Sequence, residues 1–373
     1  MTDPTADAVR SALRLVAAGQ AMPADVAEQF MDAVLEGAVT PAQLGGVLVG
    51  MHARGETAPE LAGFVRAMRN RALAIEAPEG TIDTCGTGGD VRGTFNISTA
   101  TALIVAAAGV PVAKAGNRAV SSQAGSSDVM AALGLRVEQT PAEAELSLRK
   151  DSFAYLHAPA FHPGMRHAGP VRRELGVGTA FNLIGPLANP ARPRRQLVGV
   201  PSDAAAQSVA GVLVELGSER AFVVTGERLD ELPLDGSGVI FEVTRDGVDR
   251  RPVTRADHGL PEADTDSFVG GDGAANAARI RAIFERAADG PVRDVVALNA
   301  AASLLVAGRV ADLRQGVELA IETIDSGAAA DQLERLRAAA ATAEADAVAA
   351  ASLQAAAGAA SASTVAPSEV RAS

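Results

Sequence analysis

A glycine-rich segment, residues 86–90 (GTGGD), is the first part of the chain whose residue types suit chemistry. It follows a predicted strand at residues 81–84, and residues 96–99 (NIST) then open an apolar helix. Glycines let backbone N–H groups approach phosphate closely, and a helix N-terminus adds free N–H groups and the positive end of its dipole. Taken alone, the segment is equally consistent with phosphate binding and with a tight turn before an ordinary helix cap.

A second polar segment, residues 114–122 (KAGNRAVSS), follows the next predicted strand. It supplies an ammonium group, a guanidinium group, an amide, two hydroxyl groups and a flexible glycine. In open α/β sheets, ligands bind at the carboxyl ends of the strands. Two such segments on successive strands therefore predict a site that holds a diphosphate from two sides.

The elements that position these segments change in character near residue 81. Before about residue 75 the chain predicts consecutive short helices, with Pro23, Thr40 and Thr57 at helix starts. Beyond it, short strands alternate with Ala-rich helices, which predicts parallel βαβ units. The predicted strands are residues 81–84, 110–114, 153–157, 197–200 and 221–225, and the predicted helices are about 97–108, 126–134, 141–150 and 203–216.

These patterns predict an α/β protein in three parts. Residues 1–75 are expected to form a small helical domain, completed by a helical segment near residues 165–190. Residues 76–340 are expected to form a larger α/β domain with a central, mostly parallel sheet. Residues 341–373 are expected to form an Ala/Ser-rich, partly disordered tail, with a helix extending over residues 343–357 and disorder over residues 358–373.

Composition and charge limit the kinds of function that this chain is expected to have. The chain has 33 basic and 45 acidic residues, a net charge of −12, which disfavours nonspecific nucleic-acid binding. Its single cysteine, Cys85, excludes an intrachain disulfide and fits a reducing compartment. Residues 100–112, the longest apolar stretch, are too few to span a bilayer. We therefore expect a cytoplasmic protein without nucleic-acid or membrane partners.

Taken together, the motifs resemble one enzyme family. The order GTGGD, NxST and KxGNRxxSS is typical of the anthranilate phosphoribosyltransferases, which have the nucleoside phosphorylase or class IV phosphoribosyltransferase fold. The resemblance spans about residues 5–340 and also rests on His162-Pro163, His167, and residues 171–176, 181–187, 189–190 and 230–231. It implies an enzyme of tryptophan biosynthesis that transfers phosphoribosyl from phosphoribosyl diphosphate to anthranilate, and a homodimer formed through the helical domain.

The resemblance also assigns roles to individual residues. It implies catalytic roles for Lys114, Asn117 and Arg172, the last of which would pair with the anthranilate carboxylate. The substrate-binding residues that it implies are Gly86, Gly89, Asp90, Thr94, Asn96, Ile97, Ser98, Thr99, Lys114, Ala115, Gly116, Asn117, Arg118, Ala119, Val120, Ser121, Ser122, Ser126 and Arg172.

A magnesium site follows from the same resemblance, with Ser98, Asp230 and Glu231 as its residues. Mg²⁺ prefers hard oxygen ligands and takes the rest of its shell from water and substrate phosphates. Without the upstream motifs, Asp230 and Glu231 would be read as a solvated acidic turn, and Arg172 as an exposed surface arginine.

Two positions depart from the family pattern. Ala115 stands where the family usually has histidine beside the aromatic substrate, and His157 stands where it usually has an aromatic residue. We expect the two changes to be coupled, with His157 refilling the space left at Ala115; two unrelated changes are the alternative. A third interpretation is that the pocket accepts a different or substituted aromatic amine.

Two further functions remain as alternatives. A pyrimidine nucleoside phosphorylase shares the fold class but has a different phosphate-loop pattern. A non-enzymatic paralogue that binds nucleic acid is expected to be basic and to lack the phosphate and metal residues, whereas this chain is acidic and keeps them.

Overall fold

Four helices form the N-terminal part of the computed structural model, which describes residues 4–88, 93–118, 123–227 and 229–363. At the start of the third helix, the Thr40 side chain accepts the N–H of Gln43, and the Gln43 side chain accepts the N–H of Thr40. This capping box, with Pro41 at the first helical position, confirms the predicted helix start. The helices are α1 (Pro4–Ala17), α2 (Ala24–Glu36), α3 (Pro41–Arg54) and α4 (Ala58–Arg71).

A seven-stranded sheet in the order β3-β2-β1-β4-β5-β6-β7 forms the centre of the molecule. The first five strands are parallel, whereas β5, β6 and β7 pair antiparallel. The strands are β1 (Ile82–Gly86), β2 (Val112–Gly116), β3 (Phe153–His157), β4 (Arg195–Gly199), β5 (Arg220–Thr225), β6 (Val239–Thr244) and β7 (Gly247–Pro252). The α/β class with a mostly parallel sheet is thus confirmed.

The hairpin β6–β7 was not predicted. Its outer strand, β7, carries mainly polar and exposed residues, so it lacks the apolar alternation by which a strand is recognised. The partner strand β6 is largely buried against β5. An edge strand of this kind is defined by its neighbour rather than by its own sequence.

Helices cover both faces of the sheet. Successive side chains along each strand point to opposite faces. On one face, Ile82, Val112 and Phe153 share a core with helices α5, α6 and α13–α15. On the other face, Val198 and Val223 share a core with α11 and with all four N-terminal helices. The covering helices are α5 (Ile97–Ala107), α6 (Ser126–Ala132), α7 (Pro141–Asp151), α11 (Asp203–Glu215), α13 (Gly273–Phe284), α14 (Pro291–Val306) and α15 (Leu313–Asp325).

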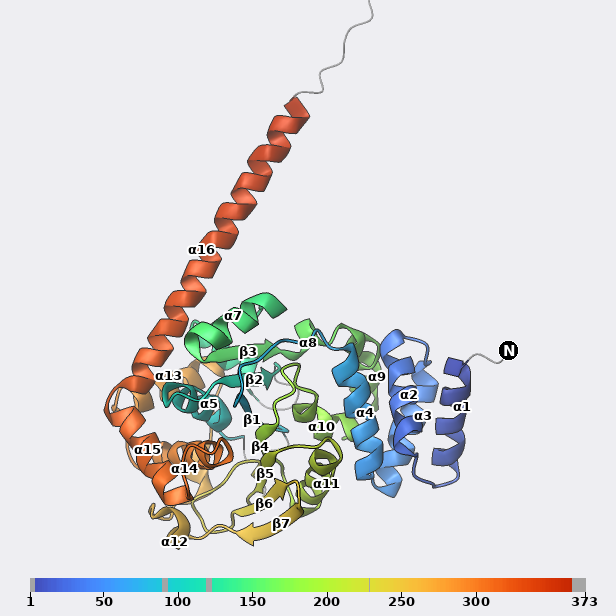
Figure 1. Cartoon of the computed structure of the whole chain (residues 1–373), viewed down its shortest axis with the longest axis horizontal. Helices are drawn as coiled ribbons and strands as arrows, with labels where there is room; N and C mark the ends of the chain where they lie inside the picture. The colour runs from blue at the N-terminus through green and yellow to red at the C-terminus, as the bar shows by residue number, and fades with distance from the viewer. Residues whose placement is uncertain (1–3, 89–92, 119–122, 228, 364–373) are drawn as a thin grey trace, which may run out of the picture.

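Short helices connect the two parts of the molecule. Between β3 and β4, α9 and α10 contribute Val171, Phe181 and Ile184 to the core of the N-terminal helices. Figure 1 shows these connecting helices between the sheet and the N-terminal helices. The helices between β3 and β4 are α8 (Ala158–Phe161), η1 (Pro163–His167), α9 (Gly169–Leu175), α10 (Ala180–Ile184) and η2 (Pro186–Ala188). Two other short helices, α12 (Arg255–His258) and η3 (Thr265–Phe268), follow β7.

The last helix, α16 (Ala328–Ser363), projects away from the α/β body (Figure 1). It continues through residues 358–363, where the sequence predicted disorder, and its alanine-rich composition favours helix. Within the described ranges, no helix is both long and apolar enough to cross a membrane.

Candidate active site

The glycine segment begins where β1 ends and turns beside Asp230. Gly88 has φ +75°, a conformation that favours glycine, and its N–H donates to Asp230 Oδ2 at 2.9 Å. A side chain on Gly86 would place Cβ 2.4 Å from the same carboxylate oxygen. Glycine is therefore needed at Gly86 because the Asp230 carboxylate approaches the backbone closely. Gly89 and Asp90 lie outside the described residues.

Asp230 and Glu231 are buried, with exposures of 6% and 7%. Glu231 Oε1 accepts the N–H of Ser98, in the first turn of α5, at 3.0 Å. A Cβ atom on Gly199, at the end of β4, would lie 1.6 Å from the Asp230 carbonyl oxygen. The interpretation of this pair as a solvated acidic turn is therefore wrong, because both carboxylates are buried and bonded to the glycine segment and to the helix that follows it.

Lys114 is also buried, with 1% exposure, in the middle of β2. Its Nζ donates to the Thr84 carbonyl at 2.7 Å and lies 3.4 Å from Ser98 Oγ. Buried ammonium groups require polar partners, and these two oxygens direct the charge toward the start of α5. Lys114, Ser98 and Glu231 thus lie together, although they come from three separate segments.

Asp83 occupies a gap between two strands and was not identified from the sequence. Only Ile82 and Val112 pair between β1 and β2. Beyond that pair, Asp83 Oδ1 accepts the N–H of Ala115 at 3.3 Å, and Oδ2 accepts the Asn189 amide at 2.8 Å. Burial raises the pKa of Asp83 to about 6, although the Lys114 charge acts to lower it. The sequence signal for Asp83 is an acidic side chain within the predicted strand at residues 81–84.

The neighbouring thiol has no sign of nucleophilic character. Cys85 is buried, and its Sγ lies 3.6 Å from Asp83 Oδ2. Burial and the nearby Asp83 charge raise the pKa of the Cys85 thiol well above its ordinary value. A thiolate is the reactive form of cysteine, so this environment suits a small buried side chain.

The segment after β2 is held by Tyr155. The Tyr155 hydroxyl lies 2.8 Å from both Ser126 Oγ and Ser127 Oγ, and burial raises its pKa to about 12. A side chain on Gly116 would place Cβ 2.4 Å from that hydroxyl. Asn117 is joined to this group through its carbonyl, which accepts from Ser126 Oγ and Ser127 N–H. These contacts bring Gly116, Asn117, Ser126 and Ser127 together at the carboxyl end of β2.

The remaining predicted substrate-binding residues have different surroundings. Arg118 is exposed and lies 3.7 Å from Asp128, whereas residues 119–122 fall outside the described ranges. Ile97 and Thr99 are buried, with exposures of 1% and 0%. Thr94 and Asn96 contact residues 268–276, which the sequence did not associate with the site.

Arg172 lies on α9, where its guanidinium stacks 5.0 Å from the Phe181 ring centroid. It is half-buried, and burial lowers its pKa from the ordinary value, although arginine remains charged at neutral pH. In the described part of the chain, no carboxylate lies within ion-pairing distance of this guanidinium. Arg172 is therefore more enclosed than the surface arginine that its local sequence alone would suggest.

The expected coupling of Ala115 and His157 is wrong. The register of β2 and β3 pairs Ala115 with Leu156 and Gly116 with His157. Because neighbouring strand residues alternate between faces, Ala115 and His157 point to opposite faces of the sheet. His157 Nδ1 instead lies 2.7 Å from Glu138 Oε1, so this side chain does not refill the space at Ala115.

Of the two other histidines in this stretch, His162 is the more enclosed. It has 8% exposure, and burial lowers its pKa to about 4. His167 lies in η1, and its ring is so close to Gly37 that a Cβ atom added at Gly37 would collide with it. His162 is therefore neutral at physiological pH, whereas His167 contributes to the packing of η1 against α2.

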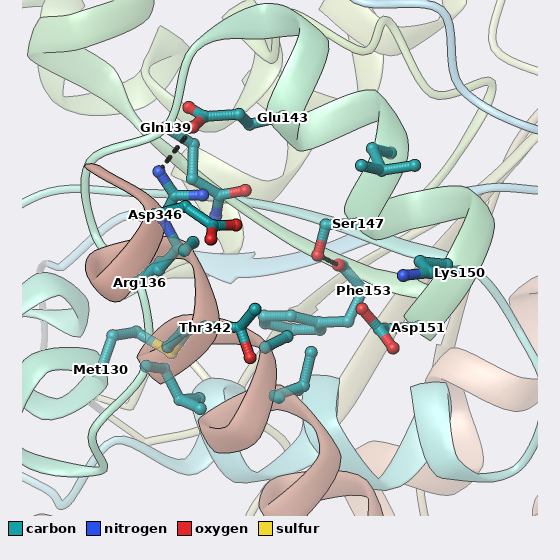
Figure 2. A pocket seen from close by; sticks show the side chains of 16 residues that line it. Met130, Arg136, Gln139, Glu143, Ser147, Lys150, Asp151, Phe153, Thr342 and Asp346 are labelled. Carbon is teal, nitrogen blue, oxygen red and sulfur yellow. Dashed lines mark hydrogen bonds and ion pairs between the residues drawn. The ribbon is translucent and has the colours of Figure 1, made fainter. Parts of the chain in front are cut away.

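Cavity volume does not identify the site. A cavity of about 320 Å³ lies between α7 and α16, lined by Arg136, Glu143, Phe153 and Thr342 among others (Figure 2). Its lining includes none of the predicted site residues. We therefore locate the candidate site by the convergence of polar groups at the carboxyl ends of β1, β2 and β4, as expected for an open α/β sheet.

Known families and structures show strong similarity to this chain. Residues 10–72 match the helical bundle domain of a glycosyl transferase family, and residues 78–330 match its α/β domain. The anthranilate phosphoribosyltransferase of Azorhizobium caulinodans is 46% identical over 331 residues, which are 88% of this chain and 96% of that protein. The enzyme of that name from Thermomicrobium roseum is also 46% identical, covering 88% and 96%.

Solved structures are also similar to this chain. The crystal structure of anthranilate phosphoribosyltransferase from Thermus thermophilus is 41% identical, has a TM-score of 0.83, and covers 89% of this chain and 98% of its own. The Saccharomyces cerevisiae enzyme in complex with PRPP and Mg is 22% identical with a TM-score of 0.81, covers 90% and 98%, and supports the fold alone. From the identity and coverage of the bacterial relatives, the chain belongs to the anthranilate phosphoribosyltransferase family.

Proposed function

We propose that the chain transfers the phosphoribosyl group of phosphoribosyl diphosphate to the amine of anthranilate. The products are N-(5-phosphoribosyl)anthranilate and pyrophosphate. The observation that carries this proposal is the bonding of two adjacent buried carboxylates, Asp230 and Glu231, to the N–H groups of Gly88 and Ser98. A phosphate loop, a helix N-terminus and an acidic pair thereby meet at one edge of the sheet.

The donor side of the site comprises Gly86, Gly88, Asn96, Ser98, Lys114, Asp230 and Glu231. We assign the diphosphate to the space between the end of β1 and the start of α5, next to the Ser98 hydroxyl, with Lys114 supplying a nearby positive charge. Asn117 and Ser126, joined at the end of β2, are placed to contact the ribose or the phosphates.

The residues present fit a magnesium ion. Mg²⁺ is commonly bound by one or two carboxylates together with substrate phosphates. Asp230 and Glu231 supply two such carboxylates, and Ser98 adds a hydroxyl oxygen next to the bonded Glu231. When bound there, the ion would offset negative charge on the departing pyrophosphate.

The acceptor side comprises Ala115 and Arg172. The planar guanidinium of Arg172 matches a carboxylate, and its half-buried position beside Phe181 strengthens an ionic contact with anthranilate. Ala115 leaves space where a larger side chain is usual in the family, so substituted anthranilates are the second class of acceptor to test.

The chemistry needs little proton transfer from the protein. The amine nitrogen donates its lone pair to C1 of the ribose while the C1–oxygen bond to pyrophosphate breaks, and one N–H proton is lost. An aromatic amine is uncharged at neutral pH, so no strong base is needed to deprotonate it first. The protein contributes by positioning both substrates and by supplying positive charge near the leaving group.

A direct assay tests the proposal. Purified protein is mixed with phosphoribosyl diphosphate, magnesium and anthranilate, and the loss of anthranilate fluorescence is followed. Turnover supports the proposal. Turnover of a substituted anthranilate but not of anthranilate would move the acceptor assignment, and binding of single-stranded DNA at physiological salt without turnover would favour the nucleic-acid alternative.

The domain division and a homodimer are further parts of the proposal. We propose boundaries near residues 75 and 340, with α9 and α10 completing the helical part, supported by their shared core. The homodimer is proposed from the family resemblance, and exposed Val49 on α3 is a position on the helical side at which to test it. Light scattering of the wild type and of Val49→Glu tests this, because a monomeric wild type would contradict it. The cytoplasmic location stays a prediction.

A further inference from the structure

Asn276, in the first turn of α13, is a buried amide close to the donor side. It has 3% exposure, and its sequence distance from Asn96 is 180 residues. Its Nδ2 donates to Asn96 Oδ1 at 2.9 Å and to the Gly271 carbonyl at 3.2 Å. Its Oδ1 accepts the N–H of Gly271 at 2.8 Å. Both ends of this amide are therefore occupied.

These bonds determine which way the Asn96 amide faces. A backbone N–H can only donate, so the Gly271 N–H fixes the Asn276 oxygen beside it. The Asn276 nitrogen must then face Asn96, and because that nitrogen can only donate, Asn96 must present its oxygen to Asn276. The Asn96 nitrogen is left on the opposite side, 3.4 Å from the Ala124 carbonyl.

The surrounding backbone holds this arrangement in place. Residues 93–95 pair with residues 268–270 through the bridge of Thr94 with Val269, the bond of Gly270 N–H to the Gly93 carbonyl, and that of Phe95 N–H to the Phe268 carbonyl. A side chain on Gly270 would place Cβ 2.7 Å from Phe95 N and 2.9 Å from Asn276 Oδ1. The contact between the two segments therefore depends on glycine at Gly270.

A small hollow of about 90 Å³ lies beside this contact. Its lining includes Thr94, Ala124, Gly270 and Asn276 but not Asn96, so the role of Asn96 is inferred from its hydrogen bonds. An amide nitrogen carries two hydrogens, and among the described residues the Asn96 nitrogen has one acceptor, at the long distance of 3.4 Å. One N–H of Asn96 thus remains for a ligand oxygen.

We propose that Asn276 is a positioning residue, which orients the Asn96 amide so that its N–H donates to an oxygen of phosphoribosyl diphosphate. Asn276 itself makes no contact with substrate in this arrangement. The proposal rests on the proposed function, because it takes phosphoribosyl diphosphate as the ligand of Asn96. Its specific content is the direction of one amide.

The central test is a double-mutant cycle with Asn276→Ala and Asn96→Ala, read as the Kd of phosphoribosyl diphosphate with magnesium by calorimetry. Asn276→Ala should raise Kd about tenfold, the usual effect of one hydrogen bond to a charged group. In the Asn96→Ala background the same change should raise Kd less than about twofold, since coupled residues are not additive. An equal rise in both backgrounds would overturn the proposal.

Asn276→Asp sharpens the test and covers the case in which the alanine variant does not fold. Aspartate keeps an acceptor for the Gly271 N–H but places a second oxygen against Asn96, so Asn96 should turn its nitrogen toward Asp and its oxygen toward the ligand. Kd should then rise more than in Asn276→Ala. A Kd within twofold of the wild type would contradict the inferred amide direction.

Arg279→Ala is the matched control. Arg279 lies on the same helix and donates to the Val269 carbonyl at 2.7 Å, so it anchors the same loop without contacting Asn96. We expect a Kd change below about threefold. A change equal to that of Asn276→Ala would show that Asn276 only holds the loop in place and does not orient Asn96. Failure of the wild type to bind phosphoribosyl diphosphate would instead refute the proposed function, a result distinct from binding with additive effects.

Discussion

The donor side and the acceptor side of the site differ in how they are held. Donor-side groups are buried and bonded across distant segments, as in the contacts of Asp230 with Gly88 and of Lys114 with Thr84. On the acceptor side, Arg172 projects from a seven-residue helix and is supported mainly by the Phe181 ring. The donor-side residues form a buried polar network, whereas the acceptor side as proposed rests on the single charge of Arg172.

This difference reflects what each substrate requires. A diphosphate has many oxygens, and each must exchange its water contacts for protein contacts of good geometry. A planar aromatic acid needs one ionic contact and an apolar surface, which allows substitution at positions such as Ala115. We therefore expect changes on the donor side to abolish turnover and changes on the acceptor side to alter affinity for one substrate.

The largest effect should come from removing the acidic pair. Asp230→Asn with Glu231→Gln keeps the side-chain shapes but removes both charges, so kcat/KM should fall about a thousandfold or more. Steady-state kinetics measure this, with circular dichroism to check the fold. Asp235→Asn, at an exposed acid of the same loop, is the control and should keep normal activity. Persistent activity of the double variant would refute the metal assignment.

Arg172→Ala should affect one substrate only. Loss of a charge-assisted contact should raise the KM for anthranilate about 10- to 100-fold and leave the KM for phosphoribosyl diphosphate within about twofold. Arg172→Lys should recover only part of the loss, because an ammonium lacks the planar geometry of guanidinium. The exposed neighbour Arg173→Ala serves as the control. An equal rise in both KM values would show that the two sides are not separable.

His162 should make the stability of the protein depend on pH. Its folded-state pKa of about 4 lies below the ordinary 6.5, so the unfolded chain binds more protons between these values. Stability should therefore be fully present above about pH 6.5 and fall by up to about 3 kcal/mol as the pH drops to 4. Urea unfolding at several pH values measures this. His162→Gln should lessen the acid loss, and an unchanged slope would contradict the assignment to His162.

The smallest effect concerns Ala115 and His157. Because they point to opposite faces of the sheet, Ala115→His and His157→Phe should change kcat/KM for anthranilate additively, within about 0.5 kcal/mol. Ala115→His is expected to act alone on the acceptor pocket. A double-mutant cycle with a larger coupling would restore the idea that the two positions compensate.

Much of the fold and part of the site could be predicted from local sequence. The strands β1 to β5 and the helices between them follow apolar runs separated by glycine and proline, so their succession along the chain was predicted correctly. Of the hairpin β6–β7, β7 was missed because it is polar and exposed, whereas β6 (VIFEVT) has an apolar run that was overlooked. The length of α16 was underestimated because alanine-rich sequence without an apolar face resembles a disordered tail.

By itself, the sequence determined which residue types stand at the ends of β1 and β2, and hence that an anion site was expected there. Only the tertiary structure decided that Asp230 is bonded to Gly88, that Asp83 fills the gap beside Ala115, and that Asn276 orients Asn96. The physical reason is distance along the chain. Local spacing specifies helices, strands and turns, whereas the partner of a buried polar group is set by packing between segments that the sequence separates.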